Sequence, residues 1–402
     1  MLNFELKTTE KFVLRDYQQE ACDKAVDFLN DKLPHRPIIV APTGSGKSLY
    51  IADITDRINV PTLVLQPSKE LLEQNYGKYM TYGKYASIFS ASMGEKEVGS
   101  AVTFGMIGSV INTAELFKHI EVVIIDECHL VPPDPNSQYM RLLTQELPHA
   151  KVLGLTATPI RMKTYLCPYR NINYSKLNVL FHERPRFFDS VLHITQISEM
   201  VDRGYYCPIK YRVERFDESL LEKNSTGADF TEQSMLKADE ENQIEQRTLE
   251  LVAEGLSKGR KNCLTFVRSV DQAERMADTH PDYAALSAKT KKKDRTEIVA
   301  GFKAGKIKAV FNVGVLTVGF DYPELDFVIT ARPTLSLALY MQMIGRGVRP
   351  AEGKDKLVYI DLCGNIDRFG RVETIKFEKI GRKYQITNNG KNLTDVEMGR
   401  DY

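Results

Sequence analysis

Two adjacent carboxylates and a histidine, Asp126, Glu127 and His129, follow an apolar run in the sequence. The run, residues 122–125, consists of four β-branched residues, which is typical of a central parallel strand covered on both faces. In open α/β sheets, the chemistry takes place outside the carboxyl ends of such strands. We therefore expect this strand to present the two acids to a ligand.

Residues 41–48 are typical of a phosphate-binding loop, which would hold a ligand on which those acids can act. Its glycines let backbone N–H groups converge on phosphate oxygens, Lys47 adds positive charge at the β- and γ-phosphates, and Ser48 offers a hydroxyl group to Mg²⁺. Ala41 replaces the first glycine of the consensus, which costs little because the tight turn lies at 44–46. A chance glycine-rich turn is the alternative, but strand, loop and helix follow one another in register. The predicted nucleotide-binding residues of this loop are Pro42, Thr43, Gly44, Ser45, Gly46, Lys47 and Ser48.

Strands alternate with helical patterns from residue 38 to residue 158, which predicts a parallel, doubly wound sheet and one nucleotide-binding domain. Its last strand ends in two hydroxyl residues, Thr156 and Thr158, which could bridge a metal-bound carboxylate to a neighbouring element. Ser68 and Lys69 begin a helix and could hold a nucleic-acid phosphate, although they equally suit an ordinary helix cap.

The first predicted helix begins near Arg15 and Gln18. A glutamine can donate and accept hydrogen bonds at once, which matches the edge of adenine. The alternative for these two residues is the solvated start of a helix.

A second alternation of strands and helices begins at residue 262 and has no phosphate loop of its own. Gln342, Arg346 and Arg349 are about one helical turn apart, so we expect them to project from one face. This asymmetry fits a site assembled across a cleft, where the arginines of one domain stabilise charge on a γ-phosphoryl group. The lysine run at 289–293 suits either a solvated face or a contact with backbone phosphates.

Composition narrows the class of protein. The 402 residues include 54 lysines and arginines and 53 acids, so any nucleic-acid surface must be local. Six scattered cysteines without a C-x-x-C pair argue against a zinc site and a disulfide framework. The sequence shows neither an apolar run of roughly 18 residues nor a signal-peptide pattern. We therefore expect a cytoplasmic protein, of a bacterial or phage-infected cell, without a membrane partner.

Taken in order, the motifs resemble those of the superfamily 2 helicases over about residues 10–365. Three of these segments most resemble the RadD-like and type III restriction-like branch, which comprises DNA-directed motors. They are the Asp-Glu-Cys-His box, Leu-Thr-Ala-Thr-Pro-Ile-Arg and Gln-Met-Ile-Gly-Arg-Gly-Val-Arg. The residues that carry the resemblance are 14–18, 41–48, 67–71, 126–129, 156–158, 314–321 and 342–349.

The resemblance implies an α/β fold of two tandem RecA-like domains with the ATP site in the cleft between them. The expected boundaries are residues 1–163 for the first domain, 164–187 for a linker, 188–365 for the second domain and 366–402 for a short C-terminal extension.

The resemblance also implies roles for single residues. Glu127 would orient and deprotonate the attacking water, Asp126 would hold Mg²⁺ with Ser48, and Gln18 with Arg15 would recognise adenine. The residues implied to couple the nucleotide site to the strand-binding surface are His129, Thr156 and Thr158. Those implied to lie at or near the γ-phosphate are Gln342, Arg346, Arg349, Gly319 and Asp321. Those implied to contact nucleic acid are Pro67, Ser68, Lys69, Thr103, Arg268 and Thr317.

The implied function is an ATP-dependent DNA helicase or translocase that uses ATP and Mg²⁺. We expect a monomer that binds single-stranded, forked or branched DNA with little sequence preference. One alternative is an RNA helicase, which shares every motif, although Cys128 in place of alanine favours DNA. The other is a nucleotide-switched clamp without processive movement, which Glu127, Arg346 and Arg349 argue against.

Overall fold

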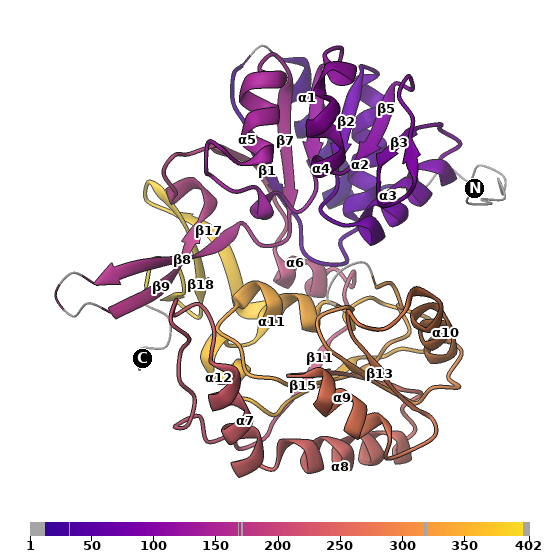
Figure 1. Cartoon of the computed structure of the whole chain (residues 1–402), viewed down its shortest axis with the longest axis vertical. Helices are drawn as coiled ribbons and strands as arrows, with labels where there is room; N and C mark the ends of the chain where they lie inside the picture. The colour runs from indigo at the N-terminus through magenta and orange to yellow at the C-terminus, as the bar shows by residue number, and fades with distance from the viewer. Residues whose placement is uncertain (1–12, 32, 168, 170–171, 317–319, 397–402) are drawn as a thin grey trace. The chain divides into compact units, whose positions relative to one another are not determined.

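The computed structural model describes residues 13–31, 33–167, 169, 172–316 and 320–396. The chain divides into two units (Figure 1). The first contains the residues up to Arg161 together with Asn178–Thr195, and the second contains Met162–Leu177 and the residues from Gln196 onward. Each unit has its own sheet with helices packed against it, which confirms the α/β class and the pair of RecA-like domains.

The sheet of the first unit has the strand order β10-β1-β7-β6-β2-β5-β3-β4, and every neighbouring pair is parallel except β3 and β4. Its strands are β1 (Pro37–Val40), β2 (Thr62–Leu65), β3 (Ser87–Ser90), β4 (Glu95–Lys96), β5 (Val102–Gly105), β6 (Val122–Ile125), β7 (Lys151–Thr156) and β10 (Ser190–Ile194). The α-helices are α1 (Asp16–Asn30), α2 (Lys47–Ile58), α3 (Lys69–Thr81), α4 (Ile107–Val110) and α5 (Gln138–Arg141).

The central strands of this sheet are covered on both faces. Every residue of β1, β2, β5 and β6 is buried, as their nearly continuous apolar sequences predict. Because β1, β7 and β6 are consecutive neighbours and parallel, the segments that follow them meet at one edge of the sheet. The phosphate loop, the two threonines and the two acids are those segments.

The sheet of the second unit has the order β11-β16-β15-β12-β14-β13, and all of its neighbouring pairs are parallel. Its strands are β11 (Ile209–Val213), β12 (Cys263–Val267), β13 (Tyr283–Leu286), β14 (Ala309–Asn312), β15 (Phe327–Ala331) and β16 (Leu357–Asp361). The α-helices are α6 (Ile197–Asp202), α7 (Glu232–Glu241), α8 (Ile244–Ser257), α9 (Val270–Ala277), α10 (Lys292–Lys303), α11 (Leu337–Ile344) and α12 (Asn365–Phe369).

Two segments have more structure than the sequence indicated. The expected linker, residues 164–187, contains most of a separate two-stranded sheet of β8 (Ile160–Cys167) and β9 (Ile172–Val179). The expected extension, residues 366–402, contains an antiparallel sheet of β17 (Ile375–Ile380), β18 (Lys383–Asn388) and β19 (Lys391–Asn392). In addition, β10 lies beyond the expected boundary at 188 but belongs to the first unit, because it pairs in parallel with β1.

Within the described part of the chain, no helix combines the length and the apolar character that crossing a bilayer requires.

Candidate active site

The phosphate loop turns from β1 into α2, whose first residue is Lys47. Gly44 and Gly46 adopt left-handed conformations with φ of 91° and 88°, which favour glycine. A Cβ atom at Gly46 would lie 2.7 Å from the side-chain nitrogen of Gln18. Backbone conformation and space therefore both require glycine at position 46.

Gln18 is part of this loop's support and is not solvated, because only 3% of its surface is exposed. Its Nε2 donates a hydrogen bond to the Ser45 carbonyl at 2.8 Å, and the Tyr17 hydroxyl donates to the same oxygen at 2.9 Å. Its Oε1 accepts a hydrogen bond from the Arg15 backbone N–H at 2.9 Å. Adenine recognition by Gln18 and Arg15 stays a prediction, and the structure adds a role in holding the loop.

The two acids after β6 have different surroundings. Asp126 is buried, and its Oδ1 accepts a hydrogen bond from the Glu127 backbone N–H at 2.9 Å. Glu127 adopts a left-handed conformation and places its carboxylate 3.3 Å from Lys47 Nζ and 3.4 Å from His129 Nδ1. Burial and the Glu127 charge raise the pKa of Asp126. Burial also acts to raise the pKa of Glu127, but Lys47 and His129 outweigh it and lower that pKa. Glu127 is thus kept ionised.

The three predicted coupling residues lie together. His129 Nδ1 is 2.8 Å from Thr156 Oγ1, which also accepts a hydrogen bond from the Thr158 backbone N–H at 3.0 Å. The Thr156 carbonyl accepts a hydrogen bond from the Ala41 backbone N–H at 2.9 Å. Thr156 therefore joins the histidine to the first residue of the phosphate loop.

Asn75 is a site residue that the sequence analysis missed. Ser48 Oγ donates to Asn75 Oδ1 at 2.5 Å, and Asn75 Nδ2 donates to Asp126 Oδ2 at 2.9 Å. One buried amide thus bridges the hydroxyl and the carboxylate predicted to bind Mg²⁺. A signal was available in the sequence, because the buried residues of α3 recur at Leu71, Asn75 and Tyr79, which places a polar residue on an apolar stripe.

Arg161 is a second missed residue. Its Nε donates to the His129 carbonyl at 3.1 Å, and its Nη2 donates to the Val131 carbonyl at 2.5 Å. Its Nη1 forms an ion pair with Glu183 at 2.6 Å. The guanidinium group therefore fixes the backbone of the segment that carries His129.

The nucleic-acid contacts predicted in the first unit have unequal support. Ser68 caps α3, since its Oγ accepts a hydrogen bond from the Leu71 N–H at 3.3 Å, and neighbouring Pro67 is partly exposed. Lys69 Nζ donates to the Ser92 carbonyl at 2.5 Å. Thr103 is only 2% exposed inside β5, so its position does not support a contact with nucleic acid.

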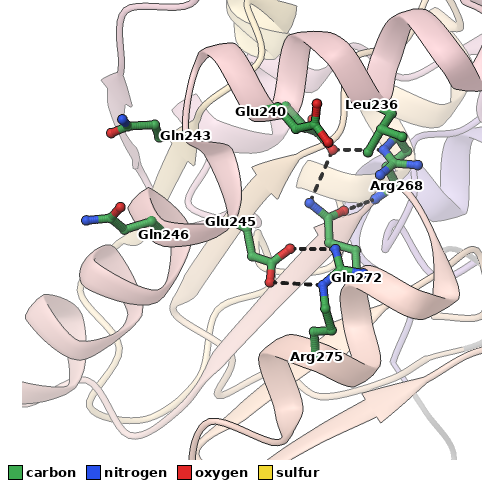
Figure 2. Close-up of a pocket in the computed structure, with 9 residues that line it drawn as sticks. Leu236, Glu240, Gln243, Glu245, Gln246, Arg268, Gln272 and Arg275 are labelled. Carbon is green, nitrogen blue, oxygen red and sulfur yellow. Dashed lines mark hydrogen bonds and ion pairs between the residues drawn. The ribbon is translucent and has the colours of Figure 1, made fainter.

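Arg268, a predicted nucleic-acid contact of the second unit, lies in the wall of a pocket between α7, α8 and α9, with 9% of its side chain exposed (Figure 2). Its Nε forms an ion pair with Asp239 at 2.8 Å, and Gln272 Nε2 donates to the same Asp239 oxygen at 3.2 Å. Burial raises the pKa of Asp239 and Arg268 opposes that shift. The charge of Arg268 is therefore already balanced. The pocket is lined by Leu236, Asp239, Glu240, Gln243, Glu245, Gln246, Arg268, Gln272 and Arg275.

Gln342, Arg346 and Arg349 do not share a helix face. That expectation is wrong because α11 ends at Ile344. Gln342 lies in the last turn of α11, whereas both arginines follow the helix. Arg346 is 8% exposed and donates to the Phe320 carbonyl at 2.8 Å, and Arg349 pairs with Asp321. Both arginines thus bind the segment after β14. Thr317 and Gly319 lie outside the described residues.

Lys354 holds the arginine segment and was also missed. Its Nζ donates to the carbonyls of Gly347, Arg349 and Pro323 at 2.6, 2.7 and 2.9 Å. Burial lowers the pKa of this lysine. Its role is to fix the backbone on both sides of the two arginines.

Two family models match the chain. Residues 11–161 match the res subunit of type III restriction enzymes, and residues 245–351 match the conserved C-terminal domain of helicases. The first match lies in the first unit and the second match lies in the second unit.

Individual proteins resemble nearly the whole chain. IRC3 of Saccharomyces cerevisiae, which carries the name of an ATP-dependent helicase, is 25% identical over 88% of this chain and 52% of its own length. The DNA 3'-5' translocase XPB2 of Sulfurisphaera tokodaii is 25% identical over 89% of this chain and 83% of its own. The type ISP restriction-modification enzyme LlaBIII, solved bound to DNA, has a TM-score of 0.63 at 16% identity and covers 90% of this chain and 28% of its own. The chain thus spans about half the length of the yeast relative.

Proposed function

We propose that the chain hydrolyses ATP as a nucleic-acid-stimulated motor of the superfamily 2 helicases and that it moves on or remodels DNA. The observation that carries the proposal is a series of close polar contacts that runs from Glu127 to His129 at 3.4 Å and then, through hydrogen bonds, from His129 to Thr156 and the phosphate loop. A nucleotide bound in that loop would shift the segment that carries His129, and hydrolysis would let this segment return.

The proposed roles in the first unit follow from chemistry and position. Glu127, ionised and held between Lys47 and His129, acts as the general base toward water. Lys47 binds the β- and γ-phosphates, which frees Glu127 from its ion pair when the nucleotide is bound. Backbone N–H groups of residues 43–48 bind the remaining phosphate oxygens.

The residues present fit Mg²⁺. Ser48 Oγ and Asp126 Oδ2 are hard oxygen donors, and the single amide of Asn75 already bridges them. When bound, Mg²⁺ would supply positive charge to the phosphate oxygens. Asn75 would orient the Asp126 carboxylate from outside the coordination shell.

Replacing Asn75 with aspartate tests this bridge. A carboxylate would put two acceptors face to face at Asp126 Oδ2, so the Mg²⁺ concentration for half-maximal ATPase activity should rise about 10-fold. The same shift should appear in the Mg²⁺ dependence of ADP binding, which does not involve turnover. Asn112→Asp, at an exposed asparagine, is the matched control. If the Mg²⁺ dependence of ATPase activity and that of ADP binding are both unchanged, Asn75 does not have this role.

The second unit contributes charge in this proposal. Arg346 and Arg349 would stabilise the transferring γ-phosphoryl group after exchanging Phe320 and Asp321 for phosphate oxygens. Gln342 would bind near the same group.

The test of the function compares ATPase activators. Purified protein should hydrolyse ATP faster with single-stranded, forked or four-way-junction DNA than alone, and the stimulation should weaken as salt rises. Equal rates with and without nucleic acid would contradict the motor. Stronger stimulation and remodelling with RNA than with DNA would favour the RNA helicase.

The similarity to a protein named as a DNA translocase favours DNA over RNA. On the same basis we propose a role in repair, recombination or the processing of branched DNA in the cytoplasm. Displacement of a labelled strand would distinguish a motor from a nucleotide-switched clamp, which would bind DNA and ATP without moving.

A further inference from the structure

One stretch of the chain has a local excess of positive charge. Residues 162–182 contain the three basic residues Lys163, Arg170 and Lys176 and no aspartate or glutamate. The whole chain is nearly balanced, with 54 basic and 53 acidic residues. A polyanion is therefore attracted more strongly to this stretch than to an average part of the chain.

This stretch includes most of the two-stranded sheet of β8 and β9, whose short connection requires an antiparallel pair. One face of the pair contacts residues 225–226 at its β9 side, where Ser175 is buried, while Thr164 on the same face is exposed. Thr164 Oγ1 lies 3.1 Å from Ser175 Oγ, which donates to the Thr226 carbonyl at 2.8 Å. Asn173 on the same face donates to the Ser225 carbonyl at 2.8 Å.

The opposite face carries aromatic rings and lysines, because side chains alternate along a strand. The rings of Tyr165 and Tyr174 stack with centroids 5.7 Å apart and planes 24° apart. Lys163 Nζ lies 5.8 Å from the Tyr165 centroid, and Lys176 Nζ lies 5.9 and 5.6 Å from the centroids of Tyr165 and Tyr174. Among the described residues, no carboxylate forms an ion pair with either lysine.

The end of the hairpin continues the aromatic character, since Tyr169 is 96% exposed. A tyrosine this exposed contributes nothing to the packing of the hairpin. Nucleobases stack on such rings while lysines attract the neighbouring phosphates, and this combination is how proteins bind single strands without sequence preference. A duplex offers fewer base faces, because its bases already stack on one another.

We propose that the face formed by Lys163, Tyr165, Tyr174 and Lys176, called the platform below, binds a single strand of nucleic acid, with bases on the tyrosines and phosphates on the lysines. The inference rests on the proposed function and adds the residues that grip the strand. It also locates the local basic surface that the balanced composition requires.

The position of β8 in the chain connects the proposed strand-binding face to the residues around the phosphate loop. The strand begins at Ile160, two residues after Thr158, and its second residue, Arg161, holds the carbonyls of His129 and Val131. Movement of the histidine segment would therefore reach the hairpin through continuous backbone.

A single tryptophan can report this binding, because the chain contains none. Tyr165→Trp keeps an aromatic ring at the platform, and a stacked base should quench its emission on titration with a thymidine oligonucleotide. The control is Tyr85→Trp, at a 64% exposed tyrosine preceding β3, whose emission should not change. Quenching of Tyr165→Trp with an equal response to blunt duplex would overturn the preference for a single strand.

Two variants test the energetic contribution. Tyr174→Ala should weaken single-strand binding about 10-fold through the loss of stacking. Lys163→Ala with Lys176→Ala should make the slope of log affinity against log salt shallower by about 1.4, as expected for two phosphate contacts. The matched control is Lys379→Ala with Lys383→Ala, which removes the same charge from the β17–β18 ribbon.

The outcomes separate this proposal from the proposed function. If the parent ATPase responds to single-stranded DNA but Tyr165→Trp shows no quenching and Tyr174→Ala binds normally, the platform is wrong and the motor stands. If no nucleic acid stimulates or binds the parent, both are wrong. If Tyr174→Ala lowers binding only as much as it lowers the folded fraction in thermal unfolding, the stack serves the hairpin alone and the platform is overturned.

Discussion

Replacing Glu127 with glutamine should lower the rate of ATP hydrolysis about 10³-fold, within the range expected for loss of a general base, while ATP still binds. Glutamine retains the size of the side chain but cannot accept the proton of the attacking water. The neighbours of Glu127 lower its pKa, so it is ionised and competent at neutral pH. Binding should survive because Lys47 and the backbone of the phosphate loop remain in place.

The measurement is single-turnover hydrolysis with enzyme in excess, together with equilibrium binding of a fluorescent ATP analogue. Glu121→Gln, at an exposed glutamate just before β6, is the control and should leave both values unchanged. Turnover within a few-fold of the parent would assign the base to another residue.

The backbone at Glu127 explains how the side chain reaches its neighbours. Its φ and ψ of 48° lie in the left-handed region, which is uncommon for residues other than glycine. The Asp126 carboxylate accepts the Glu127 N–H and stabilises this turn. The chain therefore turns immediately after β6 and places the second acid beside Lys47. Strain of this kind is concentrated at functional sites.

The sequence predicts well what depends on local pattern. Residue type and spacing predict the phosphate loop, the buried strand before Asp126 and the threonines at the end of β7, and the parallel sheet then brings these segments together. The tertiary partners of these residues were not predictable in the same way. Asn75 is 27 residues from Ser48 and 51 from Asp126, so its bridge exists only once α3 is packed.

The second unit shows the same limit. The spacing of Gln342, Arg346 and Arg349 suits one helix face, but the helix ends between the first and second of them. After the helix ends, Lys354 binds the Gly347 carbonyl, and the backbone that carries the two arginines is no longer helical. Arg268 follows a strand as the motif predicts, yet Asp239, 29 residues earlier, neutralises it. Helical periodicity and motif order cannot reveal such pairings.

The box Asp-Glu-Cys-His has a structural requirement at its third position. Cys128 is fully buried, and its Sγ would lie only 2.7 Å from a Cβ atom added to Gly154. Such an atom would also lie 2.9 Å from side-chain carbons of Ile38 and Phe188. Gly154 is in the middle of β7, next to β6 and β1. The close approach of Cys128 to the sheet therefore requires a glycine there.

Replacing Gly154 with alanine should lower the free energy of unfolding by about 3 kcal/mol, at the upper end of the usual cost of overpacking a core. The side chains that the new methyl group would meet, those of Cys128, Ile38 and Phe188, are buried, so none can move aside into solvent. Adding Cys128→Ala should restore about 1 kcal/mol, because it removes the nearest of the three contacts. The single variant should also lose ATPase activity, since Cys128 lies between Glu127 and His129.

Urea unfolding of the full chain, followed by circular dichroism for the parent, both single variants and the double variant, measures the coupling. Gly108→Ala is the matched control, because its added Cβ would meet only Gln138 Oε1 at 3.9 Å. Additive effects of Gly154→Ala and Cys128→Ala would show that the two positions do not compete for space. A positive coupling would establish that the cysteine of the box and the glycine of β7 together set the depth at which Glu127 and His129 lie.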